Sequence, residues 1–320
     1  MTKLKVLLLN KFWPLTMGHY FMRALQRRDD IELKTCGQFS GSYIGWKGGM
    51  RVPEKYVYTP DIPLSLRMEE QAIDYGMVKP SLGDWKPDLI LNVSSTCYWK
   101  NKPTDGLCAA VAVDPHVLDY DPARKVSDKF FNMQKVYSKE GDIYLPYAYD
   151  PTVHYEDTAV EKIYDVAMVG LEYPHRLKLA DELRKIGLRV YINTGEIFDD
   201  YRRVNSQSHI VLNWSTLDDL NARAFEAPMM GIPVMNMVTD MQYFEAFSRV
   251  LSFPCVNEVQ DKSHFVSAAV EQVKWAIDNL DEAKENNILT RKELANETYD
   301  NRIQKILDNC GFGGSNASSN

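Results

Sequence analysis

Short apolar runs, separated by loops and amphipathic segments, recur along the first half of the chain. The spacing of apolar residues over 19–28 predicts an amphipathic helix, and residues 37–63, rich in glycine and aromatic residues, are expected to be irregular. Four apolar runs predict buried strands, because strands of a parallel sheet are covered on both faces; they lie at 6–10, 31–35, 88–93 and 108–113.

The same alternation restarts after a proline-punctuated closing strand and linker at residues 142–151. Further strands are predicted at 165–169, 188–192, 209–213 and 232–236, with helices at 176–186, 198–205 and 222–230 between them and more helices from about 263 to 308. Alternating units of this kind predict open parallel sheets with helices on both faces. The expected fold class is therefore α/β, with two doubly wound, Rossmann-like domains.

The position of this linker suggests where the two domains begin and end. We expect an N-terminal domain over 1–155 and a C-terminal domain over 156–310, each long enough to bury its own core. The terminal helix, at about 291–309, is a candidate to pack back on the first domain. The tail over 311–320, rich in Gly, Ser and Asn, is expected to be disordered.

Composition narrows the class of protein. The 320 residues carry a net charge of −7, from 37 Lys and Arg against 44 Asp and Glu, which weighs against a protein that coats nucleic acid. The five cysteines are scattered, with no CxxC pair or zinc spacing, as in a reduced cytoplasmic protein. The N-terminal apolar run is too short for a signal sequence, and no stretch approaches the ~20 apolar residues of a membrane span, so a cytoplasmic protein is expected.

The strongest cluster of candidate chemistry follows the strand predicted at 209–213. That strand ends at Asn213, a loop carries Asp218 and Asn221, and the next helix carries Arg223 and Glu226. An Arg at a helix N-terminus is typical of a phosphate site, and a Glu one turn further can accept hydrogen bonds from a ribose diol. The same two residues, three apart on a helix, also fit a surface ion pair.

Residues 165–234 resemble the CgeB-like (spore-protein-type) branch of the GT-B glycosyltransferases, of the group 1 type. The resemblance depends on NARAFEAPMMGIP, which matches N-x-R-x-F-E followed by G-x-P, on a strand ending at Gly170, and on a helix led by Arg176. LPYAYDP (145–151) and ETYDNRIQKIL (297–307) are similar to the interdomain linker and terminal helix of that branch. Asp218 and Glu226 have the spacing of its acid-x7-acid pair, with Asp in place of the usual first Glu.

The resemblance implies a GT-B fold, with two domains facing a cleft, and transfer of a sugar from a nucleotide sugar, such as a UDP-sugar, to an acceptor hydroxyl. It implies that Glu226 binds the ribose, Arg223 neutralises the diphosphate, and Asp218 lies near the transferred sugar. Gly170 would let the backbone approach the diphosphate. Arg176, Asn213 and Asn221 are further members of the expected donor-binding set. The resemblance also implies that Gly18, in the loop after the first predicted strand, contacts the diphosphate.

The resemblance also implies retention of configuration and no requirement for a metal, because arginines and helix dipoles stabilise the leaving diphosphate in GT-B enzymes. Asp119 and Asp121 match the D-x-D signature of metal-dependent transferases literally. Their proline-flanked loop favours a turn instead.

The N-terminal half is expected to supply the acceptor site and any catalytic base. Gly18 and His19 follow the first predicted strand, and Asp114 and His116 follow the strand over 108–113. A His or a carboxylate in these positions can deprotonate an acceptor hydroxyl. Each pair fits equally well a turn residue or a solvated polar side chain.

Several functions are compatible with these patterns. The acceptor can be a protein, a saccharide, a small molecule, or a hydroxymethylated pyrimidine in viral DNA, since viral enzymes for that reaction use the same fold. The acidic net charge weighs against DNA as the acceptor. A basic N-terminal domain would make DNA a plausible acceptor again. A non-catalytic coat or binding protein with the same fold is an alternative from another class. A nicotinamide-dependent oxidoreductase is discarded, because KFWPLTMGH has one glycine where G-x-G-x-x-G is required.

Overall fold

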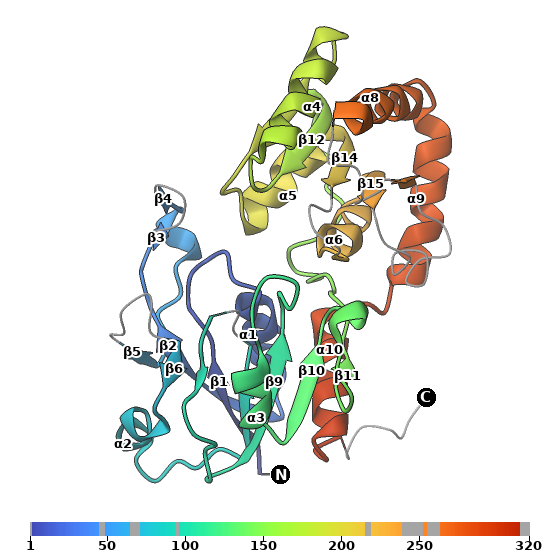
Figure 1. Ribbon diagram of the computed structural model, residues 1–320. Helices are drawn as coiled ribbons and strands as arrows, with labels where there is room; N and C mark the ends of the chain where they lie inside the picture. The colour runs from blue at the N-terminus through green and yellow to red at the C-terminus, as the bar shows by residue number, and fades with distance from the viewer. Residues whose placement is uncertain are drawn as a thin grey trace. The chain divides into compact units, whose positions relative to one another are not determined.

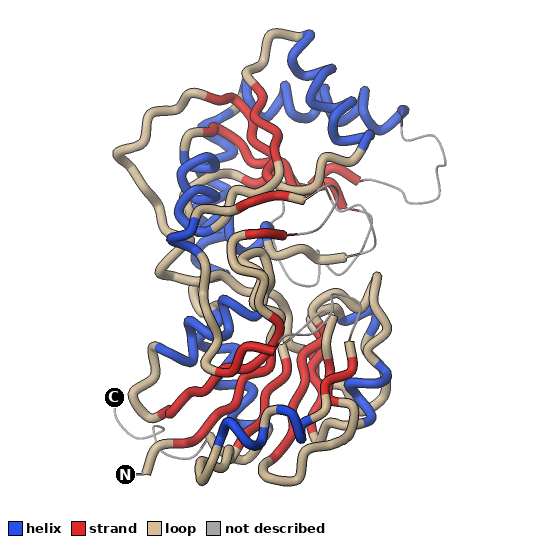
Figure 2. The backbone as a smooth tube through the Cα atoms, turned by 90° about the vertical axis from the view of Figure 1, so that its left-hand side faces the viewer, coloured by secondary structure: helices blue, strands red, loops and turns tan. Residues whose placement is uncertain are grey.

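A computed structural model of the chain describes residues 2–44, 49–64, 71–93, 96–214, 219–238, 252–254 and 263–313. The chain divides into two compact units. The first contains Met1–Pro146 together with Tyr299–Asn320, and the second contains Tyr147–Thr298. Each unit is built around one parallel sheet with helices on its faces (Figures 1 and 2).

The first unit contains a seven-stranded sheet in the order β11-β10-β9-β7-β1-β2-β5, in which every pair is parallel. From β1 the chain adds strands outward on one side and then continues on the other, so the order reverses between β1 and β7. The strands are β1 (Leu4–Leu9), β2 (Ile31–Gln38), β5 (Ile62–Leu64), β7 (Leu89–Asn92), β9 (Leu107–Ala112), β10 (Lys129–Asn132) and β11 (Ile143–Tyr144).

The four strands predicted in this half are confirmed, within one to three residues at each end. The segment over 37–63 is not wholly irregular, since Tyr43–Ile44 pairs antiparallel with Met50–Arg51 and the segment ends in β5 at the sheet edge. The other short elements of this unit are β3 (Tyr43–Ile44), β4 (Met50–Arg51), η1 (Glu54–Tyr56), β6 (Ala72–Ile73), η2 (Tyr75–Met77), β8 (Tyr98–Trp99) and η3 (Lys135–Tyr137).

The helices of the first unit are α1 (Gly18–Gln26), α2 (Lys79–Leu82), α3 (Asp121–Lys125) and α10 (Tyr299–Asn309). Helix α10 packs on α1, with the Tyr299 ring stacked on Tyr20 at 5.1 Å between centroids. Arg302 Nε donates a hydrogen bond to the carbonyl of Pro146 at 2.7 Å. The last helix therefore belongs to the first unit, although it follows the second unit in sequence.

The second unit contains the sheet β13-β12-β14-β15-β16, again entirely parallel, with its order reversing between β12 and β14. Its strands are β12 (Tyr164–Val169), β13 (Val190–Asn193), β14 (Ser208–Trp214), β15 (Val234–Val238) and β16 (Ser252–Pro254). Its helices are α4 (Pro174–Lys185), α5 (Phe198–Ser206), α6 (Arg223–Met229), α8 (Ser263–Asp278) and α9 (Leu280–Leu294).

Alternation along β12 shows how this sheet is covered on both faces. Val166 and Met168 pack into a core with α4 and α8, whereas Ala167 and Val169 pack on the opposite face with α5 and α6. Successive strand residues point to opposite faces, so a strand covered on both sides must be apolar throughout. This is why the run DVAMV is continuous rather than alternating.

The boundary between the units falls before Tyr147, not after residue 155. The residues after it are already buried in the second unit, Asp150 and His154 included. Asp150 organises them into a turn, with its Oδ1 accepting hydrogen bonds from the Thr152 N–H and hydroxyl at 2.9 and 2.8 Å. Such burial joins the linker to the second core. Within the described residues, no helix is both long and apolar enough to cross a membrane.

Candidate functional site

Two arginine side chains lie at the carboxyl edge of the second sheet, where the strand order reverses between β12 and β14. Gly170 follows β12 with a φ of +146°, and a Cβ added there would lie 3.0 Å from Arg223 Nη2 and 3.6 Å from Arg176 Nη1. The absence of a side chain therefore brings both guanidinium groups against the backbone of this loop. Ligands of open α/β sheets bind at such switch points.

Backbone carbonyls at the strand ends hold the two arginines. Arg223, the first residue of α6, donates to the carbonyl of Val169 and, at 3.3 Å, to Asn213 Oδ1. Arg176, in the first turn of α4, donates to the carbonyls of Trp214 and, at 3.0 Å, Leu171. Carbonyl oxygens orient a guanidinium without cancelling its charge. The arrangement thus concentrates positive charge beside Gly170.

Glu226 lies one turn further along α6 and is 7% exposed. Burial raises the pKa of its carboxyl to about 7, and interactions with Tyr201 and Arg223 offset part of that rise. Tyr201 of α5 is buried and interacts with both groups, and burial raises the pKa of its hydroxyl. His154 Nε2 lies 3.8 Å from Glu226 Oε1. A carboxyl whose pKa is shifted this far by its surroundings is a candidate functional group.

The structure thus brings together five of the donor-binding residues expected from the sequence: Gly170, Arg176, Asn213, Arg223 and Glu226. Asn221 lies just before α6, where its carbonyl accepts a hydrogen bond from the Ala224 N–H at 3.1 Å. Asp218 lies outside the described residues. Sequence reasoning missed Tyr201 and His154, because neither stands in a motif.

In the first unit, Gly18 is needed for close packing. A Cβ at Gly18 would lie 2.2 Å from Cγ of Asn10, a fully buried side chain that follows β1. Asn10 Nδ2 donates to Thr16 Oγ1 at 3.2 Å and so ties down the loop between β1 and α1. A structural reason for Gly18 therefore exists independently of any contact with a diphosphate.

Gly18→Ala should destabilise the protein by about 1–3 kcal/mol, because the new methyl group displaces a packed side chain. Chemical denaturation measures the change in unfolding free energy. The matched test is the double variant N10A/G18A, in which the obstructing amide is gone, so its loss should be smaller than the sum of the two single losses. Strict additivity would contradict the close contact.

His19 is buried rather than presented to solvent, with 2% of its surface exposed. Its ring makes edge contacts with Phe12 and Tyr58, at centroid distances of 5.9 and 6.5 Å. Burial lowers its pKa to about 4, so the imidazole is neutral at physiological pH.

Asp114 and His116 lie in the loop after β9, also at the carboxyl edge of the first sheet. The Tyr120 hydroxyl accepts hydrogen bonds from the N–H groups of Val113 and Asp114, both at 3.2 Å, and so shapes this loop. The His116 ring lies 6.2 Å from that of Tyr137. Strand β7 separates β9 from β1, so the loop is about 10 Å from the strand that precedes His19.

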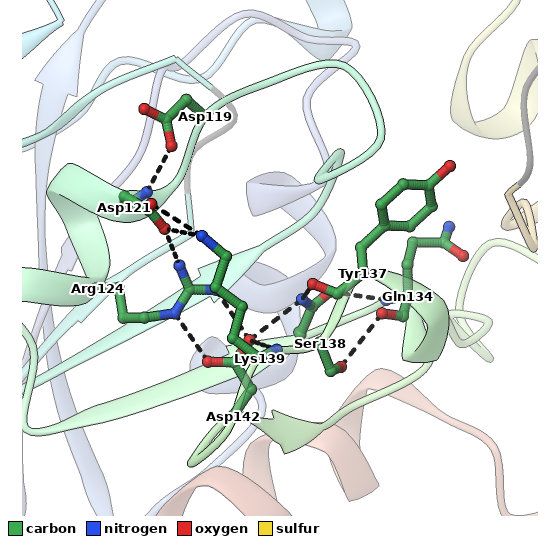
Figure 3. A network of polar contacts seen from close by, with 9 residues as sticks. Asp119, Asp121, Arg124, Gln134, Tyr137, Ser138, Lys139 and Asp142 are labelled. Atoms are coloured by element: carbon green, nitrogen blue, oxygen red, sulfur yellow. Dashed lines mark hydrogen bonds and ion pairs between the residues drawn. The ribbon is translucent and has the colours of Figure 1, made fainter.

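The two aspartates of the D-x-D match have structural partners (Figure 3). Asp119 Oδ1 accepts a hydrogen bond from the Asp121 N–H at 2.9 Å, which is an Asx turn at the start of α3. Asp121 pairs with Lys139 and Arg124, and its hydrogen bond from Lys139 lowers the pKa of its carboxyl. Arg124 also pairs with Asp142 at 2.8 Å. Among the described residues, no group of three side chains is arranged to hold a metal ion.

Neither of two cavities is lined by Arg176 or Arg223. One, of about 260 Å³, is in the first unit beside the loop after β9, lined by Thr96, Tyr98, Val117 and Tyr120 among others. The other, of about 290 Å³, is in the second unit and includes His209 and Pro233. These residues precede or begin β14 and β15, at the amino edge of the sheet. We assign the candidate donor site to the carboxyl edge, where the switch point and the charged groups coincide.

Comparison with known proteins defines the fold. No protein-family model matches the sequence, and no match is found among curated proteins. The chain is similar to a sucrose-phosphate synthase from Thermosynechococcus elongatus, with a TM-score of 0.63 and 12% identity, covering 98% of this chain and 100% of that one.

Two further solved structures match over nearly the whole chain. One is an alpha-glucosyltransferase in complex with UDP and a 13-mer DNA containing an HMU base, with a TM-score of 0.60 and 9% identity, covering 97% of this chain and 100% of that one. Another is a UDP-GlcNAc 2-epimerase from Neisseria meningitidis bound to UDP-GlcNAc, with a TM-score of 0.51 and 11% identity, covering 95% and 100%.

These similarities show that the chain has the GT-B fold, which confirms the expected α/β class with two Rossmann-like units. The neighbours are of the glycosyltransferase type, with an epimerase among them. Identities of 9–12% show fold alone, because one fold supports many reactions.

Proposed function

We propose that the protein transfers a sugar from a nucleoside-diphosphate sugar to an acceptor hydroxyl, with the donor bound at the carboxyl edge of the second sheet. The observation that carries this proposal is the pairing of Arg176 and Arg223 around Gly170, with the buried Glu226 carboxyl one helical turn away. A nucleoside diphosphate needs both kinds of group, cations for its phosphates and an acceptor for its ribose hydroxyls.

In this proposal each group has one task. Arg223 and Arg176 neutralise the negative charge that accumulates on the diphosphate as it leaves, which stabilises the transition state. Gly170 leaves room for the phosphates to approach the backbone, and Asn213 orients Arg223 by accepting its hydrogen bond at 3.3 Å. Glu226, when ionised, accepts hydrogen bonds from the ribose.

Finer features of the proposal rest on the sequence resemblance. On that basis we propose that the protein is a member of the CgeB-like branch and transfers the sugar with retention of configuration. Asp218 then lies beside the transferred sugar. The two arginines supply the charge that a divalent cation supplies elsewhere, so we propose a metal-independent reaction. A UDP-sugar is the first donor to test, because two structural neighbours are complexes with UDP or UDP-GlcNAc.

The first unit supplies the acceptor side in this proposal. Asp114 or His116, in the loop beside the cavity of about 260 Å³, is the candidate base for the acceptor hydroxyl. His19 is a weaker candidate, because its ring is buried against Phe12 and Tyr58.

The distribution of charge favours a nucleic acid as one acceptor to test. The second unit holds 15 Lys and Arg against 25 Asp and Glu, whereas the first holds 22 against 19. The acidic net charge therefore belongs to the donor-binding unit, and the unit proposed to meet the acceptor is net positive. Charge no longer weighs against a polyanionic acceptor. The structural neighbour that was solved with DNA containing an HMU base also favours testing a nucleic acid as the acceptor.

The proposal is tested by offering the purified protein UDP-, GDP-, ADP- and TDP-sugars. One nucleotide should raise the thermal midpoint, since a ligand at a hundred times its Kd adds about 2.7 kcal/mol of stability. Release of nucleoside diphosphate should then require an acceptor, either a saccharide or duplex DNA carrying hydroxymethylated pyrimidines. Absence of stabilisation by every nucleotide would overturn the donor site. Conversion of the donor sugar without nucleotide release would indicate an epimerase instead.

A further inference from the structure

His154 is a buried histidine that has no role in the reaction proposed above. It ends the turn Asp150–Pro151–Thr152–Val153–His154, ten residues before β12 begins, and its side chain is shielded from solvent. The His154 N–H donates to the Asp150 carbonyl at 2.8 Å, and Asp150 Oδ1 holds Thr152. The side chain is thus presented by a rigid, hydrogen-bonded turn.

One hydrogen bond sets which ring nitrogen of His154 carries the proton. The Asp150 N–H donates to His154 Nδ1 at 3.0 Å. An accepting nitrogen carries no hydrogen, so the neutral ring holds its proton on Nε2. Nε2 is the atom that lies 3.8 Å from Glu226 Oε1. A fixed N–H donor therefore stands beside the candidate ribose-binding carboxyl.

Three segments of the second unit present polar groups to Glu226. Tyr201 comes from α5, Arg223 from α6 itself, and His154 from the turn over 150–154. The His154 and Tyr201 rings make an edge contact, with 6.0 Å between centroids, so the two also fix each other. Polar neighbours from several segments restrict the orientation of the carboxyl, and preorganised groups bind a ligand with a smaller entropic cost.

We propose that His154 is a positioning residue for the nucleotide donor, which holds the Glu226 carboxyl in the orientation that accepts the ribose hydrogen bonds. The inference rests on the donor site proposed above. It differs from a purely structural role, in which His154 only closes the turn through Nδ1. The two nitrogens separate these roles, because Nδ1 contacts the turn and Nε2 faces the carboxyl.

Two substitutions test the roles of the two ring nitrogens of His154 separately. The side chain of H154N can still accept the Asp150 N–H in the position of Nδ1, but it is too short to reach Glu226. The side chain of H154Q can place an amide N–H near the position of Nε2. His209, at the start of β14 on the opposite edge of the same sheet, provides the matched control H209N. All three variants are compared with the wild-type full chain for folding by thermal denaturation.

Calorimetric titration from pH 5 to 9 is then done with UDP, GDP and ADP, with the 2′,3′-dideoxy analogue of the one that binds, and with inorganic pyrophosphate. H154N should weaken binding of the ribonucleotide by up to about tenfold, because the Glu226 carboxyl loses the neighbouring group that orients it. The pH midpoint of that binding should move upward, because the ionised carboxyl loses a neighbouring donor. Affinities for pyrophosphate and the dideoxy analogue should not change, and H154Q should recover most of the loss.

The outcomes distinguish this inference from the proposed function. If the wild-type protein binds none of the nucleotides, the donor site itself is wrong. If it binds one and H154N binds it with the same affinity and pH midpoint, the donor site stands and the positioning role is refuted. An equal loss of ribonucleotide, dideoxy analogue and pyrophosphate in H154N would likewise refute it, since that pattern reports damage to the whole site.

Discussion

Replacing Arg223 with Ala should lower kcat/KM for the nucleotide sugar by about 10²–10³-fold, the usual effect of removing one preorganised group that stabilises a developing negative charge. Arg223 begins α6, and its guanidinium is held by the Val169 carbonyl and Asn213 next to Gly170. That group need not reorganise when the diphosphate leaves. Its removal should therefore reduce kcat as well as donor affinity.

A conservative change and a distant one make this prediction specific. Arg223→Lys keeps the charge but loses the fork that bonds Val169 and Asn213, so activity should fall between wild type and Arg223→Ala. Arg189→Ala removes an exposed arginine that pairs with Asp165 at the amino edge of the same sheet, and it should leave the kinetics unchanged. Steady-state kinetics with the donor identified by the nucleotide screen measure all three. Wild-type kcat/KM in Arg223→Ala would exclude a role at the diphosphate.

The strand framework of both units could be predicted because parallel strands covered on both faces must be apolar throughout. The run CAAVAV produced a correct strand for that reason, and so did DVAMV. Strand β10 (Lys129–Asn132) was missed because its four residues include a lysine and an asparagine. Strand β11 (Ile143–Tyr144) lies within the closing strand and linker predicted at 142–151. The unit boundary was placed too late because the buried side chains of the linker pack on residues distant in sequence.

Residues of the candidate site could be predicted only where polar or charged side chains directly follow the end of a strand. Asn213 and Arg223 stand directly after β14 or at the start of the next helix, so topology alone places them at the switch point. The environment of Glu226 was not predictable. Its burial depends on Tyr201 and His154, which come from other segments and show no pattern of their own. Tertiary packing, rather than local sequence, determines the pKa of this carboxyl.

That pKa leads to a second prediction, in which Glu226→Gln should make the protein more stable at pH 8 by about 3 kcal/mol and leave its stability unchanged near pH 4. The pKa of the carboxyl rises from 4.5 to about 7 on folding, because burial disfavours the ionised form. Between these values the folded state binds more protons than the unfolded state, so wild-type stability falls as pH rises through this window. Glutamine has nearly the same shape and no charge to bury, so its stability should not follow that fall.

Chemical denaturation at several pH values from 4 to 8.5 measures this difference, with Glu182→Gln on the exposed face of α4 as the control that should show none. The same Glu226→Gln variant should lose about 1.5–3 kcal/mol of nucleotide binding, because an amide replaces the charged acceptor of the ribose hydrogen bonds. Greater stability with weaker binding is the signature of a group kept for function at a cost to the fold. A variant less stable than wild type at pH 8 would mean that the ionised Glu226 is compensated by its neighbours, and that its role is structural.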